Sequence, residues 1–304
     1  MTDPLVWLPP DLDGLQGLPD GLRYETFDAD GELPASKDDV RFYVLPYRFR
    51  RSDGELLARL PGLEVVQTLS AGIEHVAPLV PDGVTLCNGR GIHDTSTAEL
   101  ALTLTLASLR GIPDFVRAQG EAAWRPEKRE SLADKQVLIV GYGQIGAAIE
   151  ARLLTFECEV TRVARSARDG VHPIEELPDL LPAADVVIVI VPGTEQTRGL
   201  FDAQMLGRLK DGALFVNLAR GPVADTDALL AELTSGRIHA ALDVVDPEPL
   251  PPEHPLWTAP HLLISPHVGG SSSAMDVRGR RLVLAQLARY AAGEPLENVV
   301  TGDY

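Results

Sequence analysis

The feature that most constrains this fold is a glycine-rich turn set between an apolar strand and a helix. The run KQVLIV leads directly into GYGQIG at residues 141–146, and AAIEARLL follows without a break. In that context a GxGxxG pattern is typical of a turn that binds the pyrophosphate of a dinucleotide. Gly141 permits the tight turn, Gly143 lets the backbone approach the phosphates, and Gly146 lets the helix pack closely on its strand.

The helix after this turn is expected to supply the groups that bind phosphate. The first N–H groups of any helix have no partner within it, and those of Gln144 and Ile145 should point at the pyrophosphate. The sequence therefore predicts a bound dinucleotide cofactor here.

The same alternation of strand, tight turn and helix continues to about residue 270. Apolar strands are predicted at residues 137–140, 159–164, 185–191, 213–218, 238–245 and 261–265. Near-continuous Val/Ile/Leu runs are what a sheet buried on both faces requires. The pattern predicts an α/β fold with a doubly wound parallel sheet, that is, a Rossmann domain.

A second, smaller α/β domain with a flavodoxin-like fold is predicted from the rest of the chain. Before residue 94, short apolar runs alternate with turn residues. Ser96 with Glu99 fits a capping box that opens a long helix, and Gly111 fits its end. The helix predicted at 273–292 has no strand partner in the Rossmann unit, so its apolar face should be buried elsewhere. We expect a substrate domain of residues 1–94 plus 273–304 and a dinucleotide-binding domain of residues 95–272.

The end of the second Rossmann strand indicates which coenzyme is bound. NAD-binding proteins usually carry an acidic residue there to bind the ribose hydroxyls. This chain has VARSAR at residues 163–168 instead, without an acid. Arg165, Ser166 and Arg168 would suit a 2′-phosphate, because a guanidinium makes charge-assisted hydrogen bonds with it. NADP is therefore predicted over NAD, with two solvated loop arginines as the alternative interpretation.

Three segments at the ends of later strands resemble a known family. They are VNLARG at 216–221, ALDVVDPEPL at 241–250 and SPHVGG at 265–270. They are similar to the Asn-x-x-Arg-Gly, Asp-Val-x-x-x-Glu-Pro and Pro-His-x-x-Gly signatures of the D-isomer-specific 2-hydroxyacid dehydrogenases, and they occur in that order. The resemblance, of the glyoxylate/hydroxypyruvate reductase kind, extends from about residue 65 to about residue 270. It implies an enzyme that moves a hydride between NAD(P) and a small 2-oxo or 2-hydroxy acid.

The resemblance also implies roles for individual residues. His267 would be the acid/base, because the pKa of histidine lies near neutrality, and Glu248 would favour its imidazolium form. Arg220 would hold the substrate carboxylate and polarise the ketone. Asp243 matches the residue that contacts the nicotinamide carboxamide. Formate dehydrogenases, which share the fold, pair the histidine with glutamine, so Glu248 argues against that activity.

An earlier loop resembles the one whose backbone N–H groups bind the substrate carboxylate. It comprises Ser70, Ala71 and Gly72, directly after the predicted strand LEVVQTL. The sequence leaves open the roles of Arg90, which stands where relatives often have proline, and of Trp124. Trp124 is similar to an aromatic residue that reaches the partner's pocket in some relatives, although packing in a core or interface is an equal alternative.

Composition restricts the partners and the compartment. The chain has 304 residues, with 44 acidic against 27 basic side chains and a net charge of −17, which argues against nucleic acid. Its two cysteines have no metal-site spacing, so no metal site is expected, and no segment is apolar for long enough to span a membrane. The start MTDPLVWLPP lacks the pattern of a signal peptide, and a cytoplasmic location is predicted.

The sequence thus predicts an NADP(H)-dependent reductase of a small 2-oxo acid, plausibly glyoxylate or hydroxypyruvate. Two alternatives remain: an NAD-dependent dehydrogenase of a larger D-2-hydroxy acid, and a cofactor-sensing protein like the corepressors that retain this fold. A homodimer is expected, because residues 112–126 resemble the arm that relatives exchange between subunits.

Overall fold

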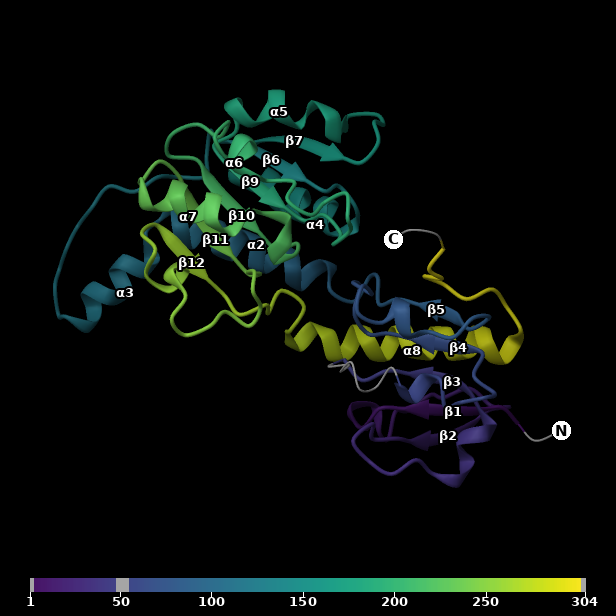
Figure 1. Cartoon of the computed structure of the whole chain (residues 1–304). Helices are drawn as coiled ribbons and strands as arrows, with labels where there is room; N and C mark the ends of the chain where they lie inside the picture. Colours follow the sequence, from purple (N-terminus) through teal and green to yellow (C-terminus); the bar gives the residue numbers. More distant parts are fainter. Residues whose placement is uncertain (1–2, 48–54, 302–304) are drawn as a thin grey trace. The chain divides into compact units, whose positions relative to one another are not determined.

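The chain divides into two compact units. The computed structural model describes residues 3–47 and 55–301 (Figure 1). One unit comprises Met1–His93 with Ser272–Tyr304, and the other comprises Asp94–Ser271. We call them the split unit and the continuous unit.

The continuous unit is built on a parallel sheet of seven strands. They are β6 (Gln136–Val140), β7 (Glu159–Ala164), β8 (His172–Pro173), β9 (Val186–Val189), β10 (Leu214–Asn217), β11 (His239–Leu242) and β12 (Leu262–Ile264). Their order across the sheet is β12-β11-β10-β9-β6-β7-β8, and every neighbouring pair is parallel. The chain winds in opposite directions from the neighbours β6 and β9, which confirms the predicted doubly wound Rossmann sheet.

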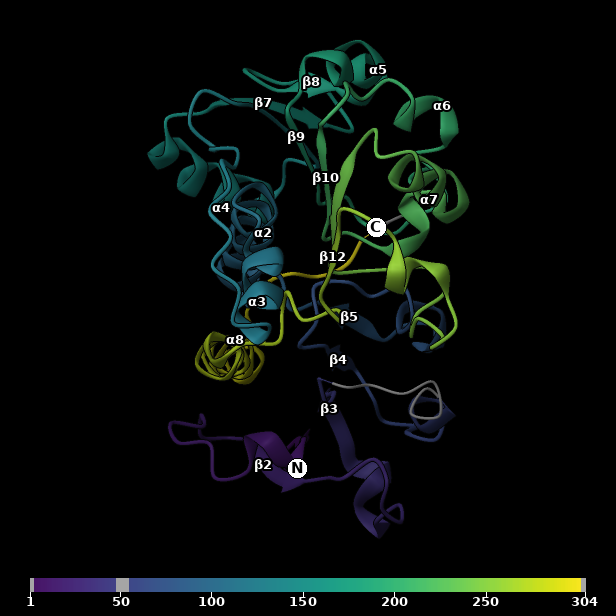
Figure 2. The same ribbon diagram turned by 90° about the vertical axis from the view of Figure 1, so that its left-hand side faces the viewer.

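Helices cover both faces of this sheet because its strands are apolar on both. In β6, Leu138 and Val140 belong to one buried cluster, whereas Val137 and Ile139 belong to another. Figure 2 shows α2 (Asp94–Leu109) and α4 (Gln144–Leu153) on one side of the strands, and α6 (Ala203–Leu206) and α7 (Thr226–Thr234) on the other. The remaining helices of this unit are α3 (Ile112–Gly120) and α5 (Leu177–Leu180).

The split unit has the predicted flavodoxin-like strand order. Its strands are β1 (Leu5–Leu8), β2 (Arg23–Thr26), β3 (Val40–Val44), β4 (Val65–Gln67) and β5 (Thr85–Cys87), all parallel, in the order β2-β1-β3-β4-β5. Helix α8 (Ser273–Ala292) buries Val283 and Leu287 against one face of this sheet. The buried amide of Gln286 on α8 donates to the side chain of Gln67, 2.8 Å away, so the last helix packs in the unit that contains the first strands.

The predicted capping box at Ser96 is wrong. Helix α2 begins at Asp94, so Ser96 lies within its first turn, where it is buried and not at the N-cap position. Among the helices of the described ranges, none is both long and apolar enough to cross a membrane.

Candidate functional site

Most of the predicted site residues lie at one edge of the continuous unit's sheet. The glycine turn follows β6, Arg165 follows β7, and Arg220 comes three residues after β10. Asp243 directly follows β11, and His267 lies three residues beyond β12. Because all these strands are parallel, their carboxyl ends meet at the same edge, which is where ligands bind in open α/β sheets.

The geometry of the glycine turn fits a dinucleotide phosphate. Gly141 has φ +104°, and a Cβ there would lie 2.4 Å from the main-chain oxygen of Ile190. A Cβ on Gly146 would lie 2.4 Å from the main-chain oxygen of Gly141, so helix α4 approaches the turn as closely as its backbone allows. A Cβ on Gly143 would meet no atom within 4 Å. The space that a phosphate needs thus lies beside Gly143, at the start of α4.

No side chain in the described part of the molecule caps the N-terminus of α4. Gly143 occupies the N-cap position, and the first backbone hydrogen bond into the helix runs from the N–H of Ala147 to its oxygen. The N–H groups of Gln144 and Ile145 belong to the first helical turn, where no helical acceptor is available to them. These two residues can therefore hold an anion with their backbone.

The residues after β7 differ in their surroundings. Arg165 and Ser166 are exposed, and within the described part of the chain Arg165 makes no hydrogen bond or ion pair. Arg168 instead donates a hydrogen bond to the main-chain oxygen of Tyr142, and its guanidinium lies over the Tyr142 ring, 5.6 Å from the ring centroid. The two arginines of the predicted phosphate site thus differ: Arg168 is held against the glycine turn, whereas the described residues offer Arg165 no hydrogen bond or ion pair.

A buried ionic cluster beneath the glycine turn was not found by sequence reasoning. Glu150 on α4 is only 6% exposed, and its carboxylate accepts hydrogen bonds from the hydroxyl of Tyr142 and the guanidinium of Arg162 on β7. The hydrogen bond from Arg162 holds the pKa of the Glu150 carboxyl below its usual range, although burial acts in the opposite direction. No spacing rule connects a strand residue to a helix residue in this way, so the sequence carried no signal for the cluster.

His267 and Glu248 form the predicted pair. Nδ1 of His267 lies 2.5 Å from Oε1 of Glu248, and both side chains are partly exposed. The hydrogen bond to Glu248 raises the pKa of the His267 imidazole, while burial and the charge of Arg220 oppose the shift. Burial alone would raise the pKa of the Glu248 carboxyl, but its hydrogen bond with His267 and the nearby positive charges lower it. The contact therefore favours the imidazolium form of His267 and the carboxylate form of Glu248, and it uses Nδ1 of the ring.

Asp243 anchors the turn that carries His267. Its side chain is buried, and Oδ1 accepts hydrogen bonds from the hydroxyl of Ser265 (2.6 Å) and the N–H of Val268 (2.9 Å). Oδ2 accepts from the N–H of Gly269 at 2.8 Å, and the main-chain oxygen accepts from the N–H of His267, also at 2.8 Å. His267 has φ +52°, a conformation that few non-glycine residues adopt, and these bonds hold it there. Three of the roughly four acceptor positions of the carboxylate are occupied by this turn.

Arg220 is presented by a loop that two other residues shape. The side-chain amide of Asn217 donates to the main-chain oxygen of Arg220 (3.1 Å) and accepts from the N–H of Ala219 (2.9 Å). A Cβ on Gly221 would lie 1.9 Å from the main-chain oxygen of Val245, so only glycine lets this loop approach the one that carries Glu248. The charge of Arg220 acts on both His267 and Glu248, which places all three near one another.

The predicted substrate loop, Ser70 to Gly72, lies in the split unit. Hydrogen bonds fix its backbone, because each main-chain oxygen from Leu69 to Gly72 accepts at least one. The donors are the side chains of His93, Thr68, Asn88 and Ser70 and the backbone N–H of Gly89. The Ser70 hydroxyl is used inside the loop, on the oxygen of Gly72, at 2.8 Å. The loop is therefore rigid, and Thr68, Asn88 and His93 are supporting residues that sequence reasoning missed. Arg90 is exposed.

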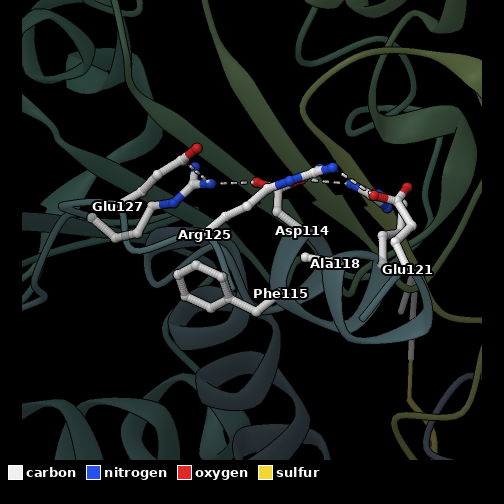
Figure 3. Close-up of a pocket in the computed structure, with 8 residues that line it drawn as sticks. Asp114, Phe115, Ala118, Glu121, Arg125 and Glu127 are labelled. Atoms are coloured by element: carbon white, nitrogen blue, oxygen red, sulfur yellow. Dashed lines mark hydrogen bonds and ion pairs between the residues drawn. The ribbon is translucent and has the colours of Figure 1, made fainter. Parts of the chain in front are cut away.

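A pocket elsewhere in the continuous unit contains none of the predicted site residues. It lies between α3 and the segment that follows it (Figure 3). Its lining charges pair with one another, as Arg129 does with Asp114 (2.8 Å) and Arg125 with Glu121 (2.7 Å). This pairing leaves the pocket without a dominant charge for a ligand.

Comparison with known proteins adds a family to this geometry. Residues 102–269 match the NAD binding domain of the D-isomer specific 2-hydroxyacid dehydrogenases. The chain is 33% identical over 250 residues to a glyoxylate reductase of Thermofilum pendens, covering 77% of this chain and 73% of that protein. It is 30% identical over 291 residues to a chloroplastic/mitochondrial formate dehydrogenase of Arabidopsis thaliana, covering 90% and 76%.

A solved structure resembles the whole chain. It is an NADPH-dependent glyoxylate/hydroxypyruvate reductase from Sinorhizobium meliloti, in complex with NADP and sulfate. The TM-score is 0.82 and the sequence identity 29%, and the match covers 98% of each chain.

Proposed function

Because this chain belongs to the D-isomer specific 2-hydroxyacid dehydrogenases, and is thus an NAD(P)-dependent enzyme of D-2-hydroxy acids, we propose that it reduces a small 2-oxo acid such as glyoxylate or hydroxypyruvate with NADPH. The observation that carries the proposal is the His267–Glu248 pair beside the charge of Arg220. The contact with Glu248 raises the pKa of the imidazole and so favours its protonated form. Reduction of a carbonyl group requires a proton donor, whereas oxidation of formate to carbon dioxide does not.

Each residue of the pair has a separate task in this reaction. The bound reduced nicotinamide supplies the hydride. Glu248 orients the imidazole through Nδ1 and stabilises its charge, so Nε2 of His267 carries the proton that the developing alkoxide takes up. Arg220 binds the substrate carboxylate and polarises the 2-oxo carbonyl, which stabilises the charge that forms on the oxygen.

Other residues bind the two ligands. The N–H groups of Gln144 and Ile145 hold the pyrophosphate beside Gly143, and Asp243 uses its remaining acceptor position for the nicotinamide carboxamide. The strand end after β7, which carries Arg165, Ser166 and Arg168, accepts a 2′-phosphate without repulsion from any acid there. The loop of Ser70, Ala71 and Gly72 binds the substrate carboxylate with its backbone.

A panel of substrates assayed with both coenzymes tests the proposal. Glyoxylate, hydroxypyruvate, pyruvate and phenylpyruvate are reduced with NADPH and with NADH in parallel, and formate is offered with NAD and with NADP. We expect the highest kcat/KM for a two- or three-carbon acid with NADPH. Preference for phenylpyruvate with NADH, turnover of formate, or coenzyme binding without any turnover would each overturn it, the last in favour of a cofactor-sensing protein.

We also propose that the enzyme is a cytoplasmic homodimer that uses the segment of residues 112–126. This segment exposes large apolar side chains: Trp124 is 96% exposed, Val116 61% and Ile112 46%. Exposed apolar groups of this size on one segment are typical of a protein interface. Light scattering at micromolar concentration should give twice the mass of the 32.7 kDa chain, and a monomer would contradict the proposal.

A further inference from the structure

Four side chains at the glycine turn form a connected cluster that the proposed reaction does not use. Tyr142 is the residue between the first two glycines, Glu150 lies on α4, Arg162 lies on β7, and Arg168 lies in the turn after β7. The cluster joins the phosphate-binding turn to the strand end that carries Arg165 and Ser166.

The inner part of the cluster is a rigid support. The buried Glu150 carboxylate accepts hydrogen bonds from the Tyr142 hydroxyl and from Arg162, whose Nε lies 2.7 Å away. Arg162 also donates to the main-chain oxygen of Gly170, 3.3 Å away. The buried carboxylate keeps both partners in place, because loss of Arg162 would leave its charge unpaired and loss of the Tyr142 hydroxyl would leave an acceptor unsatisfied. The Tyr142 ring is therefore held at its hydroxyl end.

The outer part of the cluster is Arg168, which contacts Tyr142 twice. Its guanidinium donates to the Tyr142 main-chain oxygen and lies 5.6 Å from the ring centroid, while that of Arg162 lies 5.7 Å from the same ring. The Tyr142 oxygen belongs to the peptide that leads into Gly143, the position where a Cβ would meet no atom. Arg168 thus fixes the peptide that has to approach the pyrophosphate.

We propose that Arg168 is a positioning residue that acts on the coenzyme through Tyr142, and that Arg165 alone of the two distinguishes NADPH from NADH. The inference rests on the proposed NADPH preference. The guanidinium of Arg168 is held at the glycine turn by a carbonyl and a ring, whereas Arg165 makes no hydrogen bond or ion pair within the described residues that binding a 2′-phosphate would break. Because the turn binds the pyrophosphate that both coenzymes share, the effect of Arg168 is the same for both.

Calorimetric titration separates the two arginines. Dissociation constants of NADPH and NADH are measured for the wild type, Arg168→Ala and Arg165→Ala at one ionic strength. We expect Arg168→Ala to weaken both coenzymes by a similar factor, about 3- to 10-fold, which leaves their ratio within about twofold of wild type. Arg165→Ala should weaken NADPH about tenfold and leave NADH unchanged.

Hydrogen exchange in the coenzyme-free protein provides a readout that does not involve the ligand. The backbone N–H groups of residues 141–146 should exchange faster in Arg168→Ala and at the wild-type rate in Arg165→Ala. Arg168→Lys is the matched control, because it keeps the charge but loses the planar fork and the stacking. We expect it to behave as Arg168→Ala; restoration of tight NADPH binding by lysine would instead show a direct contact with the phosphate.

The two proposals fail in different ways. Loss of NADPH binding alone in Arg168→Ala, or unchanged exchange of the turn, would overturn the positioning role. The coenzyme proposal would be overturned if the wild type showed no preference for NADPH, or if Arg165→Ala left the ratio of the two dissociation constants unchanged. Even then, equally weakened binding of NADPH and NADH by Arg168→Ala would support the positioning role.

Discussion

The side chain of Asp243 and the backbone of Gly269 are in direct contact: Oδ2 of the aspartate lies 2.8 Å from the glycine nitrogen and accepts its hydrogen bond. A Cβ at position 269 would lie 3.0 Å from that oxygen, so the turn closes as tightly as glycine permits. The general acid of the proposed reaction, His267, lies on this turn, and its geometry therefore depends on a carboxylate at the end of a different strand.

Replacing this carboxylate should impair catalysis through the turn. Both carboxylate oxygens of Asp243 accept hydrogen bonds from this turn, and Asp243→Asn replaces one of them with an NH₂ group that can only donate. A buried donor left without a partner costs about 1–3 kcal/mol of stability. We expect a fall in kcat of roughly tenfold and a lower thermal unfolding temperature. Ser265→Ala removes only one neutral donor to Oδ1 and does not touch a nicotinamide contact, so it should lower kcat less and leave coenzyme affinity unchanged. A kcat within twofold of wild type in Asp243→Asn would rule out the anchoring role.

Removing the imidazole tests the proton donor itself. His267→Ala should lower kcat for 2-oxo acid reduction by about 10²-fold or more, the usual contribution of a general acid. The dissociation constant of NADPH, measured in the absence of substrate, should stay within about threefold, because the phosphate-binding groups lie after β6 and β7. A variant that keeps a tenth of the wild-type kcat would mean that another group supplies the proton.

The pH dependence of reduction tests the partner of His267. The hydrogen bond to Glu248 raises the imidazole pKa, and only the protonated form can donate. Activity is therefore present below this raised pKa and is lost as the pH rises through it. Glu248→Gln removes the charge that stabilises imidazolium, so the alkaline limb of the kcat profile should move to lower pH. A limb at the wild-type position would show that Glu248 does not set this pKa.

The fold was predictable because apolar runs report burial on both faces of a parallel sheet. The run 159–164 became β7 without change, and the predicted last helix is α8. The run 185–191 overestimates β9, which ends at Val189, because Ile190 and Val191 remain apolar after the strand pairing stops. Apolar periodicity measures contact with the core and not the length of a hydrogen-bonded ladder, so strand ends are not fixed by it.

The candidate site was predictable only where its residues follow strand ends. His267, Asp243 and Arg220 meet at one edge because parallel strands all point their carboxyl ends there. Glu150 and Arg162 were missed because a buried ion pair between a helix and a strand depends on packing that no local spacing encodes. For the same reason the sequence did not reveal that Arg168 contacts Tyr142 whereas Arg165 has no partner in the described residues.

Two glycines of the same turn should respond to alanine in opposite ways. Gly141→Ala places a Cβ 2.4 Å from the Ile190 oxygen and on a backbone with φ +104°, so folding itself should suffer, by roughly 2 kcal/mol or more. Gly143→Ala has an extended backbone and meets no atom within 4 Å, so its thermal unfolding should match wild type within about 2 °C.

Gly143→Ala should fold normally but bind the coenzyme weakly. The methyl group of Gly143→Ala enters the space beside the start of α4, where the pyrophosphate is proposed to bind, so NADPH and NADH should both weaken by about tenfold or more. Calorimetric titration beside thermal unfolding measures both effects on the same samples. Tight coenzyme binding by Gly143→Ala would place the pyrophosphate elsewhere, because a methyl group and a phosphate cannot occupy one space.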